Sequence, residues 1–319
     1  KYMAANWMRR TIMVAACASA ALLAACGSST TESAITPQRF IAFGDAMSDV
    51  GQNGSRYTVN DGSVNNWTLQ VVANYGKTLT PASAGGTSYA TGNARVSAKP
   101  DAAGNASTRT VTEQIDTFLA SGSFANTDVV IVSGGVSDVI AGMAAVTAGT
   151  QTEAAMVAAA RKAGEDLAAQ VRRLVAAGAK YVVVTGTYDL SKSPWAKSIG
   201  REALLTDASS RFNDGLLVGI VDLGANVLYV DSAYYVNLYT SVPGNYGFNN
   251  ATTAVCTSVD ATNGIGIGAG KVNSALCNSS TLLSGANQAA YVFADSVYLT
   301  PSAQRQFGTY AYDRLRARW

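Results

Sequence analysis

The sequence FIAFGDAMSDVG, at residues 40–51, places a short apolar run directly before a turn of glycine, aspartate and serine. Residues 129–138, VVIVSGGVSD, repeat this arrangement. Runs that are apolar throughout are typical of strands covered on both faces. A glycine-rich turn between a strand and a helix presents backbone N–H groups that can hold an oxyanion or a carbonyl. The two stretches therefore predict a candidate site at the ends of two strands, although tight turns alone would also explain the glycines.

Two further apolar runs, 181–184 and 227–230, and the helical stretches before them indicate an α/β fold. Across residues 152–177, apolar side chains recur at helical spacing, and Gly178 is positioned to end that helix. A second helical stripe precedes the run at 227–230, with Gly224 as its predicted end. Helices that alternate with such strands are typical of a doubly wound sheet with mostly parallel strands. In that fold, ligands bind at the carboxyl ends of the strands.

The N-terminal segment is typical of an export signal, because two arginines precede an apolar stretch too short to span a membrane as a mature helix. The stretch ends in LAACG, residues 23–27, which resembles the lipobox of bacterial lipoproteins. Cys26 is therefore the predicted lipidation site, and Gly27 after it suggests the outer membrane. An ordinary signal peptide with a chance cysteine is the alternative. We expect an exported protein, lipid-anchored in the bacterial cell envelope, with a signal peptide at 1–25, a Ser/Thr-rich tether at 26–38 and one domain at 39–319.

The cysteine and histidine content excludes several kinds of site. The chain has four cysteines and no histidine. Cys17 lies in the predicted signal peptide and Cys26 is the predicted anchor, which leaves Cys256 and Cys277 for a disulfide in an oxidising compartment. Such a crosslink would contribute about 3 kcal/mol. We expect no metal site and no cofactor. The formal net charge of +2 comes without a basic run, so nucleic acid is not an expected partner.

Residues 264–271, GIGIGAGK, invite comparison with phosphate-binding loops. They lack the spacing of a P-loop, have Val272 where serine or threonine is needed, and follow no predicted strand. We expect a flexible loop near the disulfide instead.

Short blocks along the chain resemble those of GDSL esterases, also called SGNH hydrolases. The first is FGDAMSDVG, residues 43–51, where the family has F-G-D-S-L-S-D-x-G. The last is FADSVYLT, residues 293–300, where the family has F-x-D-x-x-H-x-T. The blocks between them follow in family order at 88–94, 134–138, 178–184, 211–213 and 243–248. The resemblance covers nearly the whole predicted mature chain. It implies a three-layer α/β/α sandwich, flavodoxin-like, around a central and mostly parallel sheet.

The family cleaves acyl esters with a serine of the first block, activated by an aspartate and a histidine of the last. Here the nucleophile position holds Ala46 and the histidine position holds Tyr298, while Asp295 remains as the triad acid. A methyl group cannot attack a carbonyl, and tyrosine, with an ordinary pKa near 10, is a poor base at neutral pH. Loss of such a triad costs about a million-fold in turnover. The family reaction is therefore not expected by the family route.

The oxyanion hole of the family is also altered. Its asparagine position holds Ser137, which is shorter, and its second-block backbone donor falls on Gly92 or Asn93. The resemblance implies that these positions and the backbone of Ala46 form the remaining oxyanion or ligand-binding groups. We expect a weakened hole.

Two substitutes for the lost triad deserve consideration. Ser48 lies two positions beyond Ala46 and is expected to cap a helix, with a role as nucleophile as the alternative. Asp45 and Asp295 could act as paired carboxylates, although in relatives of this pattern the first is a scaffold residue.

These observations predict a catalytically silenced envelope lipoprotein that binds an acyl, acetylated-glycan or lipid ligand. One alternative is an active ester hydrolase with an unorthodox nucleophile. The other is a purely structural or interaction lipoprotein. The expected partners are a small acyl or acetylated ligand and, through the lipid anchor, the membrane.

Overall fold

The computed structural model describes residues 33–319, so the predicted signal peptide and Cys26 lie outside the described residues. Of the predicted tether, residues 33–38 are described. The hydroxyl of Ser33 donates a hydrogen bond to the carbonyl of Trp319 at 2.6 Å. The chain therefore contacts the C-terminal end of the domain before the first strand begins.

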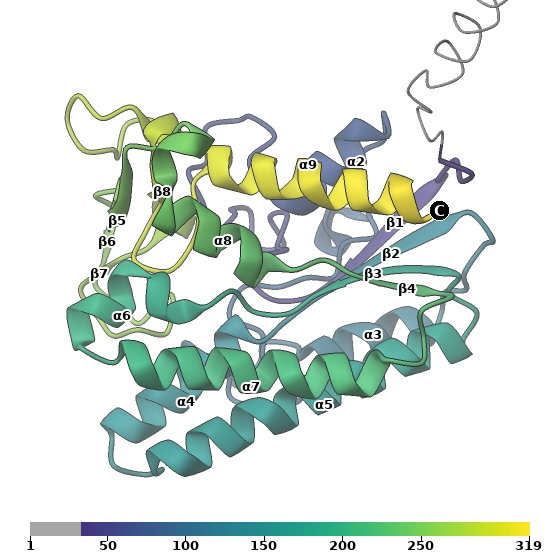
Figure 1. The fold of residues 1–319 in the computed structure, drawn as a ribbon, viewed down its shortest axis with the longest axis horizontal. Helices are drawn as coiled ribbons and strands as arrows, with labels where there is room; N and C mark the ends of the chain where they lie inside the picture. The colour runs from purple at the N-terminus through teal and green to yellow at the C-terminus, as the bar shows by residue number, and fades with distance from the viewer. Residues whose placement is uncertain (1–32) are drawn as a thin grey trace, which may run out of the picture.

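A four-stranded parallel sheet, in the order β1-β2-β3-β4, lies at the centre of the fold (Figure 1). Each of the four predicted apolar runs forms one strand. The bounds are β1 (Arg39–Phe43), β2 (Asp128–Ser133), β3 (Tyr181–Thr185) and β4 (Val227–Tyr229). On the free edge of β1, the N–H of Ala42 donates to the carbonyl of Thr87 and the N–H of Tyr89 donates to the carbonyl of Ala42. The segment around Ser88 therefore extends the sheet by one short parallel bridge.

Helices cover both faces of the sheet, which gives the three layers that the resemblance implied (Figure 1). Side chains of a strand alternate between faces. Phe40 and Ala42 pack into one core cluster with α2 and α9. Ile41 and Phe43 pack into another, with α3, α4, α5 and α7. The helices are α2 (Trp67–Asn74), α3 (Val111–Leu119), α4 (Val136–Thr147), α5 (Glu153–Ala176), α6 (Pro194–Ile199), α7 (Glu202–Ile220), α8 (Ser232–Ser241) and α9 (Pro301–Arg318), with short 3₁₀ turns at Ala82–Ala84, Leu190–Lys192, Pro243–Tyr246, Ser274–Leu276 and Gln288–Ala290.

The two long helices α5 and α7 were predicted with different success. In α5 the whole predicted stripe is buried, Thr152 caps the first turn, and Gly178 follows the helix with a φ of 103°. A Cβ at Gly164 of α5 would lie 2.0 Å from the carbonyl oxygen of Phe212, so glycine lets α7 approach closely. The prediction that α7 runs to Gly224 was wrong, because the helix ends at Ile220.

Residues 249–300 form a segment of short strands at the end of the sheet away from the C-terminus (Figure 1). The strands are β5 (Asn250–Ala254), β6 (Val259–Asp260), β7 (Lys271–Val272) and β8 (Tyr291–Phe293), with β5 parallel to β8 and β6 antiparallel to β7. The predicted disulfide between Cys256 and Cys277 is present within this segment. Within residues 33–319, no helix is both long and apolar enough to cross a membrane.

Candidate functional site

The first block forms a turn after β1, and this turn is held from behind by Gln114 of α3. The side-chain oxygen of Gln114 accepts from the N–H of Gly44, and its amide nitrogen donates to the carbonyl of Gly44, both at 2.9 Å. Ala46 lies in the turn and is only 1% exposed. The nucleophile position is therefore fixed in place and covered.

Ser48 does not cap a helix, so that prediction was wrong. Residues 45–48 form a turn and no helix begins there. The Oγ of Ser48 is 2.7 Å from the Oγ of Ser133 and accepts from Nε1 of Trp67 at 3.1 Å. The hydroxyl of Ser48 therefore links β2 to α2 in a buried network. Among the described residues no carboxylate contacts this hydroxyl, and the chain has no histidine, so no such group can act as its base. Its alternative role as a nucleophile gains no support from these contacts.

Asp295 is held by backbone donors, as its lack of an imidazole partner suggested. Its Oδ1 accepts from the N–H groups of Val297 and Tyr298, both at 2.7 Å, and its Oδ2 accepts from the N–H of Ser274 at 3.0 Å. Complete burial raises the pKa of Asp295, while these donors oppose the shift. The carboxylate thus organises the turn that carries Tyr298.

Tyr298 fills the position of the missing base. Its side chain is fully buried, and its ring packs edge-on against Tyr57 with centroids 5.2 Å apart. Burial, followed by the nearby charge of Asp45, raises the pKa of Tyr298 well above its ordinary value. Such a phenol stays protonated at every physiological pH and cannot serve as a general base.

The second and third blocks hold the positions that correspond to the oxyanion hole of the family. The N–H of Gly92 donates to Oδ2 of Asp49 at 2.7 Å, which leaves Asn93 as the candidate second-block donor. The backbone of Asn93 is left-handed, with a φ of 62°. Its side-chain nitrogen, Nδ2, donates to the carbonyl of Gly264 at 2.8 Å. Ser137, at the start of α4, is fully buried and its Oγ has no partner among the described residues.

Asp45 and Asp138 are buried carboxyl groups whose charges interact, and they are not the pair considered from the sequence. Burial raises the pKa of Asp45 to about 7, with a further contribution from the charge of Asp138. Burial likewise raises the pKa of Asp138 to about 6, although Arg95 lies 3.4 Å away and opposes the shift. Oδ1 of Asp45 accepts from the N–H of Met47 at 3.0 Å, and its Oδ2 has no partner among the described residues. Asp45 therefore holds the first turn, as a scaffold residue would.

The structure brings the family positions together but closes them off from solvent. The exposed fractions are 1% for Ala46, 6% for Asn93 and 0% for Ser137, Asp295 and Tyr298. Tyr57 lies over Gly92, since a Cβ at Gly92 would be 2.0 Å from its hydroxyl oxygen.

The 264–271 loop covers the other side of the centre. Ile265 is 2% exposed and belongs to the main core cluster. A Cβ at Gly266 would lie 2.5 Å from the carbonyl oxygen of Ala102. The first half of the loop is therefore anchored in the core, whereas Gly268 and Gly270 have open space around them, and the flexibility expected from the sequence stays a prediction.

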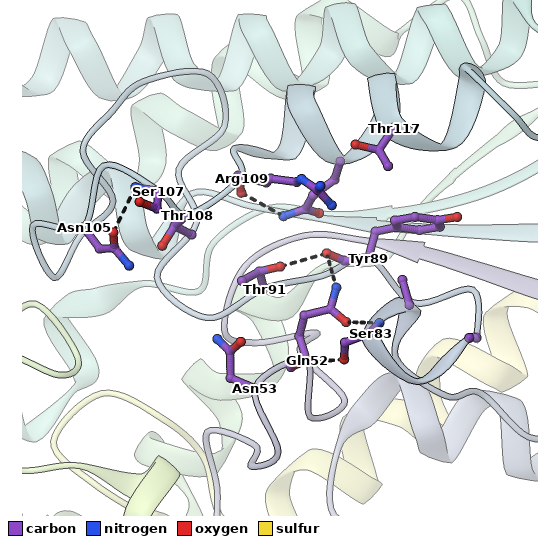
Figure 2. Close-up of a pocket in the computed structure, with 14 residues that line it drawn as sticks. Gln52, Asn53, Ser83, Tyr89, Thr91, Asn105, Ser107, Thr108, Arg109 and Thr117 are labelled. Carbon is purple, nitrogen blue, oxygen red and sulfur yellow. Dashed lines mark hydrogen bonds between the residues drawn. The ribbon is translucent and has the colours of Figure 1, made fainter.

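An open cavity of about 550 Å³ lies beside the closed centre, at the edge of the sheet next to β1 (Figure 2). We call it the side cavity. No pattern in the sequence predicted this cavity, although Gln52 and Asn53 continue the first block and Tyr89 and Thr91 belong to the second. Its lining comprises Gln52, Asn53, Ala82, Ser83, Gly85, Gly86, Tyr89, Thr91, Asn105, Ser107, Thr108, Arg109, Gln114 and Thr117. In the described part of the chain, no cluster of three or more potential metal ligands occurs.

Comparison with known proteins agrees with the block pattern and with the fold. No curated protein matches the chain. The GDSL-like lipase/acylhydrolase family matches it over residues 40–310, which is most of its length and nearly all of the described domain. The parallel sheet between two helical layers is the fold expected for that family. The chain therefore belongs to the GDSL-like lipase/acylhydrolase family.

Proposed function

We propose that this protein is a catalytically silent member of its family, which binds a ligand in the cell envelope and does not hydrolyse esters. The observation that carries the proposal is the burial of Ala46 and Tyr298 at the two positions that react in the family. A nucleophile and a base are both missing, and the space they would share with a substrate is filled. The surviving Asp295 is occupied with backbone donors.

The ester-hydrolysis assay tests the silencing directly. Wild-type protein and a Ser48→Ala variant are expected to release p-nitrophenol from p-nitrophenyl acetate and butyrate at the rate of buffer alone, because Ser48 has no base and Ala46 has no nucleophilic atom. Initial rates over a range of protein concentrations give the measurement. A rate that rises with wild-type concentration would contradict the proposal. Loss of that rate in Ser48→Ala would identify the unorthodox nucleophile.

Of the three ligand classes predicted, the structure favours the acetylated glycan over the acyl chain or lipid. An acyl chain needs an apolar slot, and the family centre that would supply one is closed. Ten of the fourteen residues that line the side cavity carry an amide or hydroxyl group, and such groups suit a polyhydroxylated ligand. The alternative of a purely structural lipoprotein draws support from exposed apolar side chains near the end of α7, where Val218 and Val221 are 65% and 79% exposed.

We also propose that the domain is anchored by a lipid on Cys26, in the outer membrane. The motivation is the LAACG sequence at residues 23–27. Cells that express the full chain and are fed radiolabelled palmitate are expected to label the wild type but not a Cys26→Ser variant. Equal labelling of both proteins, or none of the wild type, would contradict the anchor. Cys17→Ser is the matched control and should label like the wild type.

A further inference from the structure

We infer that the side cavity binds a carbohydrate that carries a carboxylate group, with Arg109 pairing with the carboxylate. This inference rests on the proposed binding function and names its site and ligand chemistry. The site lies outside the dismantled catalytic centre. Its volume of about 550 Å³ falls within the range of about 300–1,000 Å³ typical of small-molecule sites.

The inner wall of the side cavity is fixed by hydrogen bonds to the backbone. Oε1 of Gln52 accepts from the N–H of Ser83 at 3.1 Å, and the hydroxyl of Ser83 donates to the carbonyl of Gln52 at 2.7 Å. Gln114 spans both backbone groups of Gly44. The hydroxyl of Thr91 donates to the carbonyl of Tyr89 at 3.0 Å. The bonds of Gln52 with Ser83 and of Gln114 with Gly44 join segments distant in sequence, so the wall is organised before any ligand arrives, which lowers the entropic cost of binding.

The rim of the side cavity carries polar groups that remain available. Figure 2 shows Asn105 and Ser107 on one side of the cavity and Asn53 on the other. Within residues 33–319, the side chain of Asn53 and the hydroxyl of Ser107 make no hydrogen bond, while Oδ1 of Asn105 accepts from the N–H of Ser107 and leaves its amide nitrogen available. Amide and hydroxyl groups that both donate and accept match the hydroxyls of a sugar.

The positive charge in the lining of the side cavity indicates that the sugar carries a negative charge. Among the described residues that line it, Arg109 is the one charged residue, and none is acidic. The Arg109 guanidinium forms no ion pair with any described carboxylate, whereas its neighbours are satisfied: Lys99 pairs with Glu113 at 2.8 Å, and Asp101 accepts from the hydroxyl of Thr108 at 2.6 Å. An unpaired guanidinium presents a planar set of donors suited to a carboxylate.

Tyr89 supplies the one aromatic ring of the lining. Its centroid lies 5.5 Å from that of Phe43 and 6.0 Å from that of Phe118, so the ring is held against the core. A fixed ring offers a flat apolar surface for the C–H groups of a sugar while the polar rim meets its hydroxyls. The combination of a rigid wall, free amides and hydroxyls, one cation and one aromatic ring is what a carboxylated carbohydrate requires.

Calorimetric titration of the full chain, purified in detergent, tests the inference. The probes are tetrasaccharides of galacturonate, glucuronate and mannuronate, each with its carboxyl-reduced neutral form. At least one carboxylated probe is expected to bind more tightly than its neutral form. The Arg109→Gln variant should bind that probe about tenfold more weakly, the size of one lost charge-assisted hydrogen bond. Ser107→Glu adds a negative charge to the rim. This variant should weaken binding of the carboxylated probe more than binding of its neutral form.

The controls separate this inference from the proposed function. Arg314→Gln removes an exposed arginine from α9, outside the cavity lining, and should leave binding unchanged. Absence of binding by every probe, equal binding of charged and neutral forms, or equal binding by Arg109→Gln would overturn the inference while the esterase result stands. If the wild type hydrolyses esters and also binds a probe in a way that depends on Arg109, the proposed silencing is wrong, but the assignment of the side cavity stands.

Discussion

The double variant Ala46→Ser/Tyr298→His is expected to hydrolyse p-nitrophenyl acetate no faster than buffer, and adding Tyr57→Ala is expected to raise its rate about a thousand-fold. The double change restores a nucleophile and a base beside Asp295, so the triad is complete in composition. Tyr57, however, still packs against position 298 and lies over Gly92, and the substrate cannot reach the serine. Removing that ring opens the centre from the solvent side.

The expected gain of about a thousand-fold in rate is smaller than the full value of a triad, because the oxyanion hole still lacks its asparagine. A full triad is worth about a million-fold. A lost oxyanion donor costs about a hundred- to a thousand-fold, and Ser137 still stands where the family has asparagine. Adding Ser137→Asn to the triple variant should therefore raise the rate again by about a hundred-fold.

The matched control for the restoration is the same set of variants with Ala46 retained. These should stay at the buffer rate, because every active variant depends on the new serine. Activity in the double variant would contradict the role assigned to Tyr57. Inactivity of the variant with all four changes, if circular dichroism shows it folded, would contradict the claim that the frame of the site has been kept.

Replacing Asp45 by asparagine is expected to flatten the pH dependence of stability. Because the pKa of Asp45 is raised to about 7 in the folded protein, the folded state binds more protons than the unfolded state between about pH 4 and pH 7. The contribution of Asp45 to the free energy of unfolding therefore falls as the pH rises through that window. Between pH 5 and pH 8, Asp45 should account for a loss on the order of 3 kcal/mol, which Asp45→Asn removes.

Urea denaturation at pH 5, 6, 7 and 8 measures this effect. Asp138, whose pKa is raised to about 6, keeps a smaller slope of the same sign in the variant. Asp313→Asn, at an exposed position of α9, is the control and should leave the wild-type slope intact. Parallel pH profiles for wild type and Asp45→Asn would show that Asp45 is ionised in the folded protein at pH 5.

Much of the fold could be predicted because its signals are local. Strands β1 to β4 are covered on both faces, so each reads as an unbroken apolar run. The stripe of α5 repeats at helical spacing over its whole length. The ends of the elements were less secure, as α7 shows, because a last turn depends on the packing around it. The order of the family blocks identified the fold more firmly than any single element.

For the candidate site too, some features could be predicted from the sequence and others could not. The identities of Ala46, Tyr298 and Ser137 in their blocks predict from the sequence alone that the family reaction is lost. The role of Ser48 was misjudged, since its hydroxyl meets Ser133 and Trp67, which are distant in sequence. The closure of the centre was also not predicted. It depends on Tyr57 and on the loop around Ile265, which reach the strand ends only in the folded chain.

By itself, then, the sequence determined the layers of this protein, its family and the residues Ala46 and Tyr298 that motivate the proposed silencing, since each depends on residue identity and short-range periodicity. Only the tertiary structure decided that the residues at the catalytic positions of the family are closed off from solvent and that the side cavity beside them is open. Both features are made by segments separated by tens to hundreds of residues. Their burial and exposure depend on how much water those segments exclude when they meet, and no local pattern carries that information.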